Sequence, residues 1–217
     1  MLGIIFTGGE GPEPEKLRRL IDGHVTDAFI VAADSGLAAA EEAGIKPDCI
    51  IGDMDSVDSA RLEAYPEECV VRHKPDKDYT DTELALQAVI EKGCDEIWIA
   101  GGGGSNRIDH LFAIRSLFER EVFPCRWITE SADIYCIDAS AKRNVFSCRI
   151  EKDAPISVFP LGCGRWKAQS SGLKWPLESL PWDRGFFGLA NVAPNGGFSV
   201  KAEEGRFMVI IPLFSFI

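Results

Sequence analysis

Aspartate residues recur in this sequence where short apolar runs end. Asp53-Met54-Asp55-Ser56 directly follows Cys49-Ile50-Ile51-Gly52, which we expect to be a strand. In extended chain, residues i and i+2 point to the same side, so Asp53 and Asp55 are predicted to converge. Two carboxylates held together repel unless a cation or a proton lies between them. Such oxygen ligands favour Mg²⁺, whereas a solvated loop would need no ligand.

Further acidic positions have the same placement. Asp34 follows the apolar run that ends at Ala33, Asp78 and Asp81 precede a capped helix, and Asp109 follows a glycine run. In open α/β sheets, ligands bind beyond the carboxyl ends of the strands, so we expect these carboxylates to share one site. For Asp81 the alternative is a first-turn residue stabilised by the helix dipole.

A glycine run, Gly101 to Gly104, is followed by Ser105, Asn106 and Arg107 and leads into a predicted helix. Glycines let backbone N–H groups approach phosphates, and a helix N-terminus adds positive potential. The run is neither a Walker A loop nor a dinucleotide fingerprint, and a flexible turn is the alternative. Arg107 could pair bidentately with phosphate oxygens. His110 could act in catalysis, or simply pack or cap the helix start.

The elements that must position these residues change in kind near residue 130. Up to there, short apolar runs alternate with helical patterns, which is typical of a mostly parallel sheet covered on both faces. Thr80-Asp81-Thr82-Glu83 predicts a capping box that opens a helix through Ile90, closed by Gly93. Further helices are predicted at 14–21, after Gly36 and at 109–118, and strands at 4–6, 29–32, 49–51, 69–71 and 97–100.

From Ile134 onward the pattern predicts short strands and no helix, which indicates an all-β second domain. Glu203-Glu204-Gly205-Arg206 predicts a hairpin loop. Trp175 lies in a loop-like segment, where an exposed indole could stack on a cationic aromatic ligand. The strands are predicted at 134–137, 145–150, 156–159, 198–202 and 207–211.

Composition limits the partners. The chain has 217 residues, a net charge of −11 and a pI near 4.8, which argues against nucleic acid. A phosphorylated substrate stays compatible, because a divalent cation can bridge carboxylates and phosphates. The seven cysteines include no C-x-x-C pair, so they predict neither a zinc site nor a redox motif. Without a basic, long apolar leader or a span of about 20 apolar residues, we expect a cytoplasmic protein with no membrane partner.

Taken together, the motifs resemble those of the thiamine pyrophosphokinase family, in the family's order from about residue 30 to 177. The segments that carry the resemblance are Ala33-Asp34-Ser35-Gly36, Gly44 to Ser56, Lys77-Asp78-Tyr79-Thr80-Asp81-Thr82-Glu83, Arg107-Ile108-Asp109-His110 and Gly172-Leu173-Lys174-Trp175-Pro176-Leu177. The last of these is similar to the segment that contacts thiamine in the family.

The resemblance implies a fold and a reaction. The fold is an α/β nucleotide-binding catalytic domain with a mostly parallel, Rossmann-like sheet (1–132) and a thiamine-binding all-β sandwich (133–217), in a homodimer with thiamine near the interface. The reaction is that of a transferase, a kinase of thiamine diphosphate biosynthesis. It moves diphosphate from Mg-ATP to the thiamine hydroxyl and releases AMP.

The resemblance also implies roles for individual residues. The acidic metal and nucleotide site would comprise Asp34, Asp53, Asp55, Asp81 and Asp109, with Mg²⁺ on Asp53, Asp55 and Asp81. Thr80 and Arg107 would position phosphates, while Ser56, Asp78 and His110 would complete the ATP site. Trp175 would stack on thiamine, with Ser171 beside it. The residues expected to be catalytic are Asp53, Asp55, Asp81, Arg107 and Asp109. Apart from the resemblance, a carboxylate near the alcohol could accept its proton, and Asp81 is our choice for that role.

The sequence departs from the family pattern in four places: at Ser35, at Ala38, at the pair Ser105-Asn106, and at Ala190 before Asn191. The first two bear on nucleotide contacts and the last on substrate identity. Three other functions stay open. They are pyrophosphorylation of a pterin alcohol, hydrolysis by a metal-dependent phosphoesterase, and nucleotide binding by a regulator without catalysis.

Overall fold

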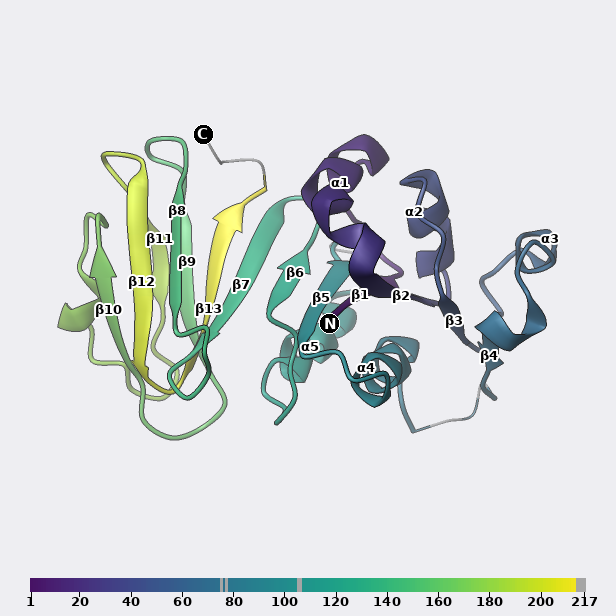
Figure 1. Cartoon of the computed structure of the whole chain (residues 1–217). Coiled ribbons are helices and arrows are strands. Elements are labelled where there is room, and N and C mark those ends of the chain that lie inside the picture. The colour runs from purple at the N-terminus through teal and green to yellow at the C-terminus, as the bar shows by residue number, and fades with distance from the viewer. Residues whose placement is uncertain (75, 77, 105–106, 214–217) are drawn as a thin grey trace. The chain divides into compact units, whose positions relative to one another are not determined.

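The computed structural model describes residues 1–74, 76, 78–104 and 107–213. The chain divides into two compact units, Met1–Ser131 and Ala132–Ile217 (Figure 1). Each unit has a hydrophobic core cluster of its own.

The strands of the first unit pair in parallel in the order β6-β5-β1-β2-β3-β4. The chain runs outward from β1 to β4 and then returns to β5 on the other side of β1. This reversal is a topological switch point, where ligands bind beyond the carboxyl ends of the strands. The strand bounds are β1 Leu2–Thr7, β2 Ala28–Ala33, β3 Cys49–Gly52, β4 Val70–Arg72, β5 Glu96–Gly101 and β6 Arg126–Ile128.

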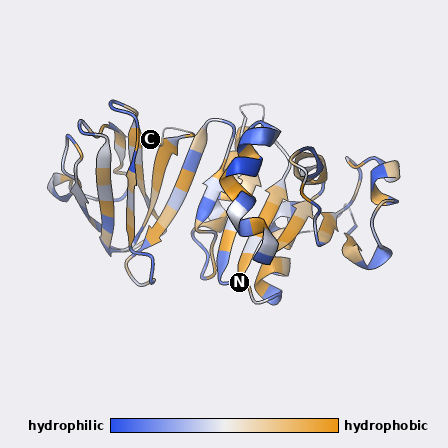
Figure 2. Cartoon of the chain, turned by 45° about the horizontal axis from the view of Figure 1, so that its top comes forward, coloured by the Kyte–Doolittle hydropathy of each residue, from blue (hydrophilic) through white to orange (hydrophobic). Residues whose placement is uncertain are grey.

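The central strands are buried on both faces, as their near-continuous apolar runs predict. Ile4, Ile5 and Phe6 are consecutive in β1 and all fully buried, and Figure 2 shows the strands as predominantly hydrophobic. Helix α2 begins directly against β1, because a Cβ on Gly36 would lie 2.2 Å from the carbonyl oxygen of Phe6. The helices are α1 Pro14–Ile21, α2 Gly36–Glu42, α3 Ser59–Leu62, α4 Asp81–Glu91 and α5 Ile108–Leu117.

The capping box predicted at the start of α4 is confirmed. Thr80 Oγ1 accepts from the backbone N of Glu83 at 3.2 Å, and the backbone N of Thr80 donates to Glu83 Oε2 at 2.9 Å. Arg120 forms an ion pair with the same glutamate. The start of α4 is therefore fixed by side chains as well as by its own backbone.

The second unit consists of antiparallel strands in two sets, β11-β9-β13-β7 and β10-β12-β8. Both sets contribute to one core, with Val158 and Phe207 from the first and Ala168 and Val200 from the second. Within the described residues, the 3-10 helix Leu177–Ser179 is the one helical element among these strands. The bounds are β7 Ala132–Asp138, β8 Val145–Arg149, β9 Ile156–Leu161, β10 Lys167–Ser171, β11 Gly188–Asn191, β12 Gly197–Glu204 and β13 Arg206–Pro212.

The prediction of a hairpin loop at Glu203–Arg206 is wrong. A tight turn is present there, but β12 pairs with β10 and β8, while β13 pairs with β7 and β9. Gly205, with φ of 75°, carries the chain from one set of strands to the other. The short strands β6, β10 and β11 were not predicted.

Thr80→Ala should lower the free energy of unfolding by about 0.5–2 kcal/mol, because it removes the side-chain acceptor at the N-terminus of α4. Urea denaturation followed by circular dichroism measures the loss. Thr26→Ala, at an exposed threonine, is the control. Equal stability of the two variants would contradict the capping role.

Candidate functional site

A cavity of about 770 Å³ lies at the carboxyl ends of β1, β2 and β3, beside the N-terminal parts of α4 and α5. The polar residues predicted for the site gather here from four separate stretches of sequence. Those that line the cavity are Asp34, Asp53, Ser56, Asp78, Thr80, Asp81, Arg107 and His110. Asp55 and Asp109 are exposed and are not among the lining residues. Lys77, Ser105 and Asn106 lie outside the described residues.

Asp34 combines a strained backbone with an unsatisfied carboxylate. Its φ is 45°, in the left-handed region that side chains other than glycine rarely adopt. Its backbone N donates to the Ile51 carbonyl at 2.9 Å, which ties the end of β2 to β3. Its Oδ1 is buried and has no hydrogen-bond partner among the described residues. A buried carboxylate oxygen in this state calls for a cation or a donor from a ligand.

Gly52 allows two of the aspartates to approach each other. A Cβ added to Gly52 would lie 3.1 Å from Asp81 Oδ1 and 3.2 Å from Asp34 Cβ. The two acidic side chains therefore flank the same backbone position, at the end of β3. Any side chain at residue 52 would push them apart.

The extended-chain reasoning for Asp53 and Asp55 is wrong, although Asp53 does reach the cavity. Strand β3 ends at Gly52, and Met54 has a φ of 64°, so the chain turns between the two aspartates. Asp53 Oδ1 accepts the backbone N–H of Asp55 at 3.1 Å. This turn leaves Asp53 in the cavity lining and Asp55 exposed.

The donor set fits a hard divalent cation. No group of three or more metal-ligating side chains is close enough to hold an ion by itself, among the residues the structure describes. Mg²⁺, however, is usually bound by one or two carboxylates together with water and substrate phosphates. Asp34, whose Oδ1 is buried, lines the cavity with Asp53 and Asp81, and the three supply carboxylates of this kind.

Arg107 pairs with Asp109 at the start of α5. Its Nε donates to Oδ1 of Asp109 at 3.0 Å and its Nη2 donates to Oδ2 at 2.7 Å. The hydrogen bond and charge of the guanidinium lower the pKa of the Asp109 carboxyl to about 2. Both side chains are exposed, and Arg107 also lines the cavity. The pairing leaves the Nη1 hydrogens of Arg107 available for another acceptor.

Trp175 has the exposed indole that the sequence predicts, with half of its surface accessible. Asn191 is buried and holds the Trp175 backbone. Its Oδ1 accepts from Trp175 N at 3.2 Å, and its Nδ2 donates to Trp175 O at 2.7 Å. Lys174 Nζ lies 4.5 Å from the centroid of the Trp175 ring, so the ring already contacts a cation. Ser171 is exposed at the end of β10.

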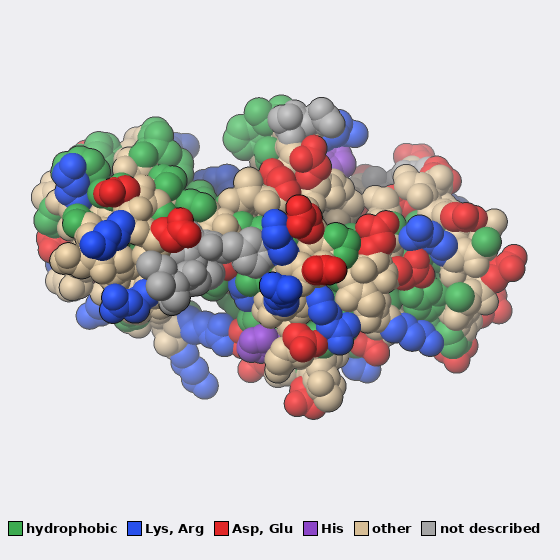
Figure 3. Space-filling model, turned by 90° about the horizontal axis from the view of Figure 1, so that it is seen from above, with side chains coloured by type: hydrophobic (Ala, Val, Ile, Leu, Met, Phe, Trp, Pro, Cys, Tyr) green, Lys and Arg blue, Asp and Glu red, His purple; other side chains and the backbone are tan. Residues whose placement is uncertain are grey.

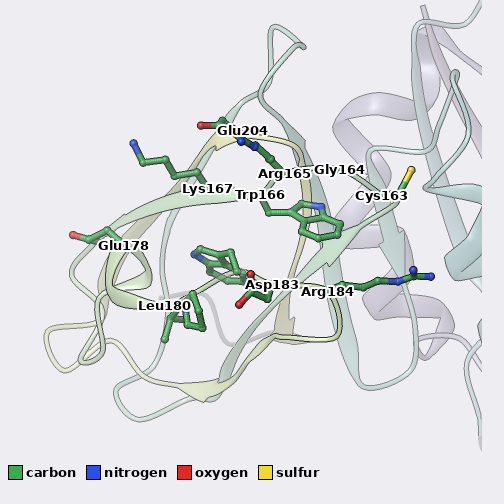
Figure 4. Close-up of a pocket in the computed structure, with 12 residues that line it drawn as sticks. Cys163, Gly164, Arg165, Trp166, Lys167, Glu178, Leu180, Asp183, Arg184 and Glu204 are labelled. Atoms are coloured by element: carbon green, nitrogen blue, oxygen red, sulfur yellow. The ribbon is translucent and has the colours of Figure 1, made fainter.

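A second cavity, of about 630 Å³, lies within the second unit (Figure 4). Trp166 lies near its centre, while the side chains of Lys167 and Arg184 point outward. Its lining contains three basic and three acidic residues, namely Arg165, Lys167, Arg184, Glu178, Asp183 and Glu204. Neither Trp175 nor Ser171 lines it, so it does not coincide with the predicted thiamine contacts.

Comparison with known proteins finds a similarity within the first unit. Residues 24–125 match the catalytic domain of thiamin pyrophosphokinase. This segment is therefore similar to that catalytic domain. The matched range includes Asp34, Asp53, Asp81 and Arg107.

Solved structures of thiamin pyrophosphokinases share the fold over nearly the whole chain. The Bacillus subtilis enzyme is 22% identical with a TM-score of 0.75, covering 97% of this chain and 98% of its own. The Geobacillus thermodenitrificans enzyme is 23% identical with a TM-score of 0.73, covering 98% and 97%. Yeast thiamin pyrophosphokinase is 13% identical with a TM-score of 0.68, covering 97% and 86%. Among curated proteins, no sequence matches significantly.

Several residues that line the cavity at the strand ends were not assigned from the sequence. Thr7, Gly8 and Gly9 line it from the end of β1, and Thr82 lines it from α4. The signal was present, because Thr7-Gly8-Gly9 directly follows the first predicted strand. Ser35, one of the departures from the family pattern, also lines the cavity, and a Cβ on Gly8 would lie 2.2 Å from its Oγ.

The molecular surface around this domain carries mixed charge. On the face shown in Figure 3, acidic and basic side chains are interspersed and do not separate into single-sign patches. No helix among the described residues is long and apolar enough to cross a membrane.

Arg107→Ala should raise the pKa of Asp109 from about 2 towards the ordinary value of 3.8, because the guanidinium is the largest cause of the lowering. Nuclear magnetic resonance titration of the side-chain carboxyl carbon measures it. Arg115→Ala is the control, since Arg115 pairs with Glu119 on the same helix. An unchanged Asp109 titration in Arg107→Ala would show that the pair does not persist in solution.

Proposed function

We propose that this chain transfers the terminal diphosphate of ATP to the hydroxyl of thiamine, giving thiamine diphosphate and AMP. The observation that carries the proposal is the acidic cavity at the switch point of the catalytic domain. It gathers Asp34, Asp53, Asp81 and Arg107 at the carboxyl ends of adjacent parallel strands and the starts of two helices. That is where an open α/β sheet binds its ligand.

The carboxylates of the cavity suit a nucleotide bound as its magnesium complex. We assign Mg²⁺ to Asp53 and Asp81, with Asp34 beside them and Asp55 as the further ligand that the resemblance implies. The ion would supply neutralisation of the charge on the phosphates. Ser56, Asp78, Thr80 and His110 would contact the nucleotide. Thr80 would do so with limited freedom, because its hydroxyl already donates to Glu83 at 3.0 Å.

The reaction forms a bond between the thiamine oxygen and the β-phosphorus of ATP. It breaks the bond from that phosphorus to the oxygen bridging to the α-phosphorus, and AMP leaves. Such a transfer depends mainly on in-line positioning and on charge stabilisation. Asp81 would accept the hydroxyl proton. Arg107, held in place by Asp109, would donate its remaining N–H groups to phosphate oxygens.

The second unit would supply recognition of thiamine. Trp175 offers an exposed aromatic face to a molecule that carries a permanent thiazolium charge. Lys174 occupies this face in the structure and would have to move aside. We therefore assign residues 133–217 as a thiamine-binding β-sandwich domain and 1–132 as the nucleotide-binding catalytic domain. A cytoplasmic homodimer completes the proposal.

The products of the reaction distinguish the proposed function from the alternatives. Purified protein incubated with ATP, Mg²⁺ and thiamine should yield AMP and thiamine diphosphate in equal amounts, measured by liquid chromatography. Inorganic phosphate formed without thiamine consumption would indicate a phosphoesterase instead. Turnover with a pterin alcohol and none with thiamine would place the protein in the other pyrophosphokinase class.

Asp53→Asn should lower kcat by about 100-fold or more with little change in Tm. It removes a charged ligand of the metal ion, and such an ion contributes several kcal/mol to stabilising the charge of the transition state. Steady-state AMP formation at limiting Mg²⁺ measures it. Asp27→Asn, at an exposed position, is the matched control. Asp55→Asn tests the resemblance separately, because Asp55 lies outside the cavity lining. Normal turnover in Asp53→Asn would remove Asp53 from the metal site.

Trp175→Ala should raise the KM for thiamine by several-fold to about tenfold, because an aromatic face contributes about 0.5–2 kcal/mol to binding a cation. The contact forms equally in the ground and transition states, so kcat should fall much less and the KM for ATP should hardly change. Trp175→Phe should recover part of the loss. A large drop in Tm with an unchanged thiamine KM would mean that Trp175 only anchors its domain.

A further inference from the structure

The hydroxyl groups of Thr7 and Thr82 meet in the cavity wall. Thr7 ends β1 and is 6% exposed, and Thr82 is the second residue of α4. Their Oγ1 atoms are 2.6 Å apart, which is a short hydrogen bond between residues 75 positions apart in the chain. Both residues line the cavity assigned to the nucleotide.

The hydrogen bond between Thr7 and Thr82 uses only one of their two hydroxyl protons. Two hydroxyl groups carry two protons, and one of these lies between the two oxygen atoms, with either threonine able to be the donor. No other hydrogen bond to either hydroxyl is found within the described residues. Because buried hydroxyl groups almost always have partners, the second proton is available to an acceptor in the cavity.

The methyl group and the hydroxyl of Thr7 face different neighbours. A Cβ on Gly102 would lie 3.2 Å from Thr7 Cγ2, so the methyl group faces the glycine run that follows β5. The hydroxyl is left to face Thr82. The hydrogen bond between the two hydroxyl groups is present before any ligand arrives, and such preorganisation reduces the entropy lost on binding.

We propose that Thr7 and Thr82 act as one hydroxyl donor to a phosphate oxygen of ATP. The inference rests on the proposed function, because it takes the cavity to be the ATP site. A phosphate oxygen is the acceptor that matches, since a hydrogen bond to an ionised group is about twice as strong as one between neutral groups. The positive end of the α4 dipole, next to Thr82, also favours an anion there.

Removing both hydroxyl groups at nearly constant volume tests the pair. The double variant Thr7→Val/Thr82→Val should bind ATP with Mg²⁺ about tenfold more weakly or worse, as expected for a lost hydrogen bond to a charged group. Thr7→Ser/Thr82→Ser keeps both donors and should bind within about twofold of the wild type. Titration calorimetry measures the Kd of ATP, with Thr26→Val as the control.

Kinetics and stability separate a positioning role from a structural one. The KM for ATP should rise in the double valine variant while the KM for thiamine stays unchanged. Because the two hydroxyl groups act as a unit, the losses of ATP binding free energy in the two single valine variants should add up to more than the loss in the double variant. If the double variant does not fold, Thr82→Val alone gives the same measurement from a partly exposed helix position.

Wild-type ATP affinity in the valine variants, or a lower Tm with unchanged Kd, overturns the proposal. A failure of the proposed pyrophosphokinase activity would be a different result from a failure of the threonine-pair proposal. A wild-type protein that binds ATP but forms no AMP from thiamine would refute the pyrophosphokinase assignment, while the ATP affinities would still decide the role of the threonine pair.

Discussion

Asp34 and Asp81 come from different elements, and both reach the backbone of Gly52 at the wall of one cavity. The surrounding structure keeps them there. Asp34 is held by the hydrogen bond from its backbone to Ile51, and Asp81 by the capping box that begins α4. The absence of a side chain at Gly52 leaves room for both. The geometry of the cavity thus depends on the backbone contacts that hold both aspartates beside Gly52.

Strain at the same edge of the sheet supports this view. Asp34 and Met54 both adopt left-handed backbone conformations, and each follows the end of a buried parallel strand. Conformations of this kind cost about 1–3 kcal/mol each and persist only where the neighbouring structure determines them. Here the buried residues of β1 to β3 supply that support, and one of the two strained residues, Asp34, lines the cavity.

The sequence predicted the parallel arrangement and the helix cap because both depend on local chemistry. Near-continuous apolar runs indicate strands that are buried on both faces of a sheet. The capping box forms its hydrogen bonds between Thr80 and Glu83, within four residues of sequence. The sequence also predicted which acidic residues lie at strand ends. It could not predict the turn at Met54, because methionine carries no signal for a positive φ. Its extended-chain assumption therefore misplaced Asp55.

Other features were inaccessible because they are decided by tertiary packing. The turn at Gly205 looks like a hairpin in sequence, but which strands pair is decided by the core they share. The contact between Thr7 and Thr82 spans 75 residues and exists only once β1 and α4 are in place. The pairing of Arg107 with Asp109 is local, yet phosphate was the partner expected for that arginine.

For the proposed nucleotide, the charge of the cavity also determines the form in which it would enter. Asp34, Asp53, Asp78 and Asp81 line the wall, while the guanidinium of Arg107 is already neutralised by Asp109. Bare ATP carries several negative charges and would be repelled at the mouth, whereas a nucleotide with a bound divalent cation brings its own compensation. Such a pocket discriminates by net charge before any base or ribose contact forms. Because the magnesium complex would be repelled less than bare ATP, the rate of nucleotide binding would depend on the concentration of free magnesium.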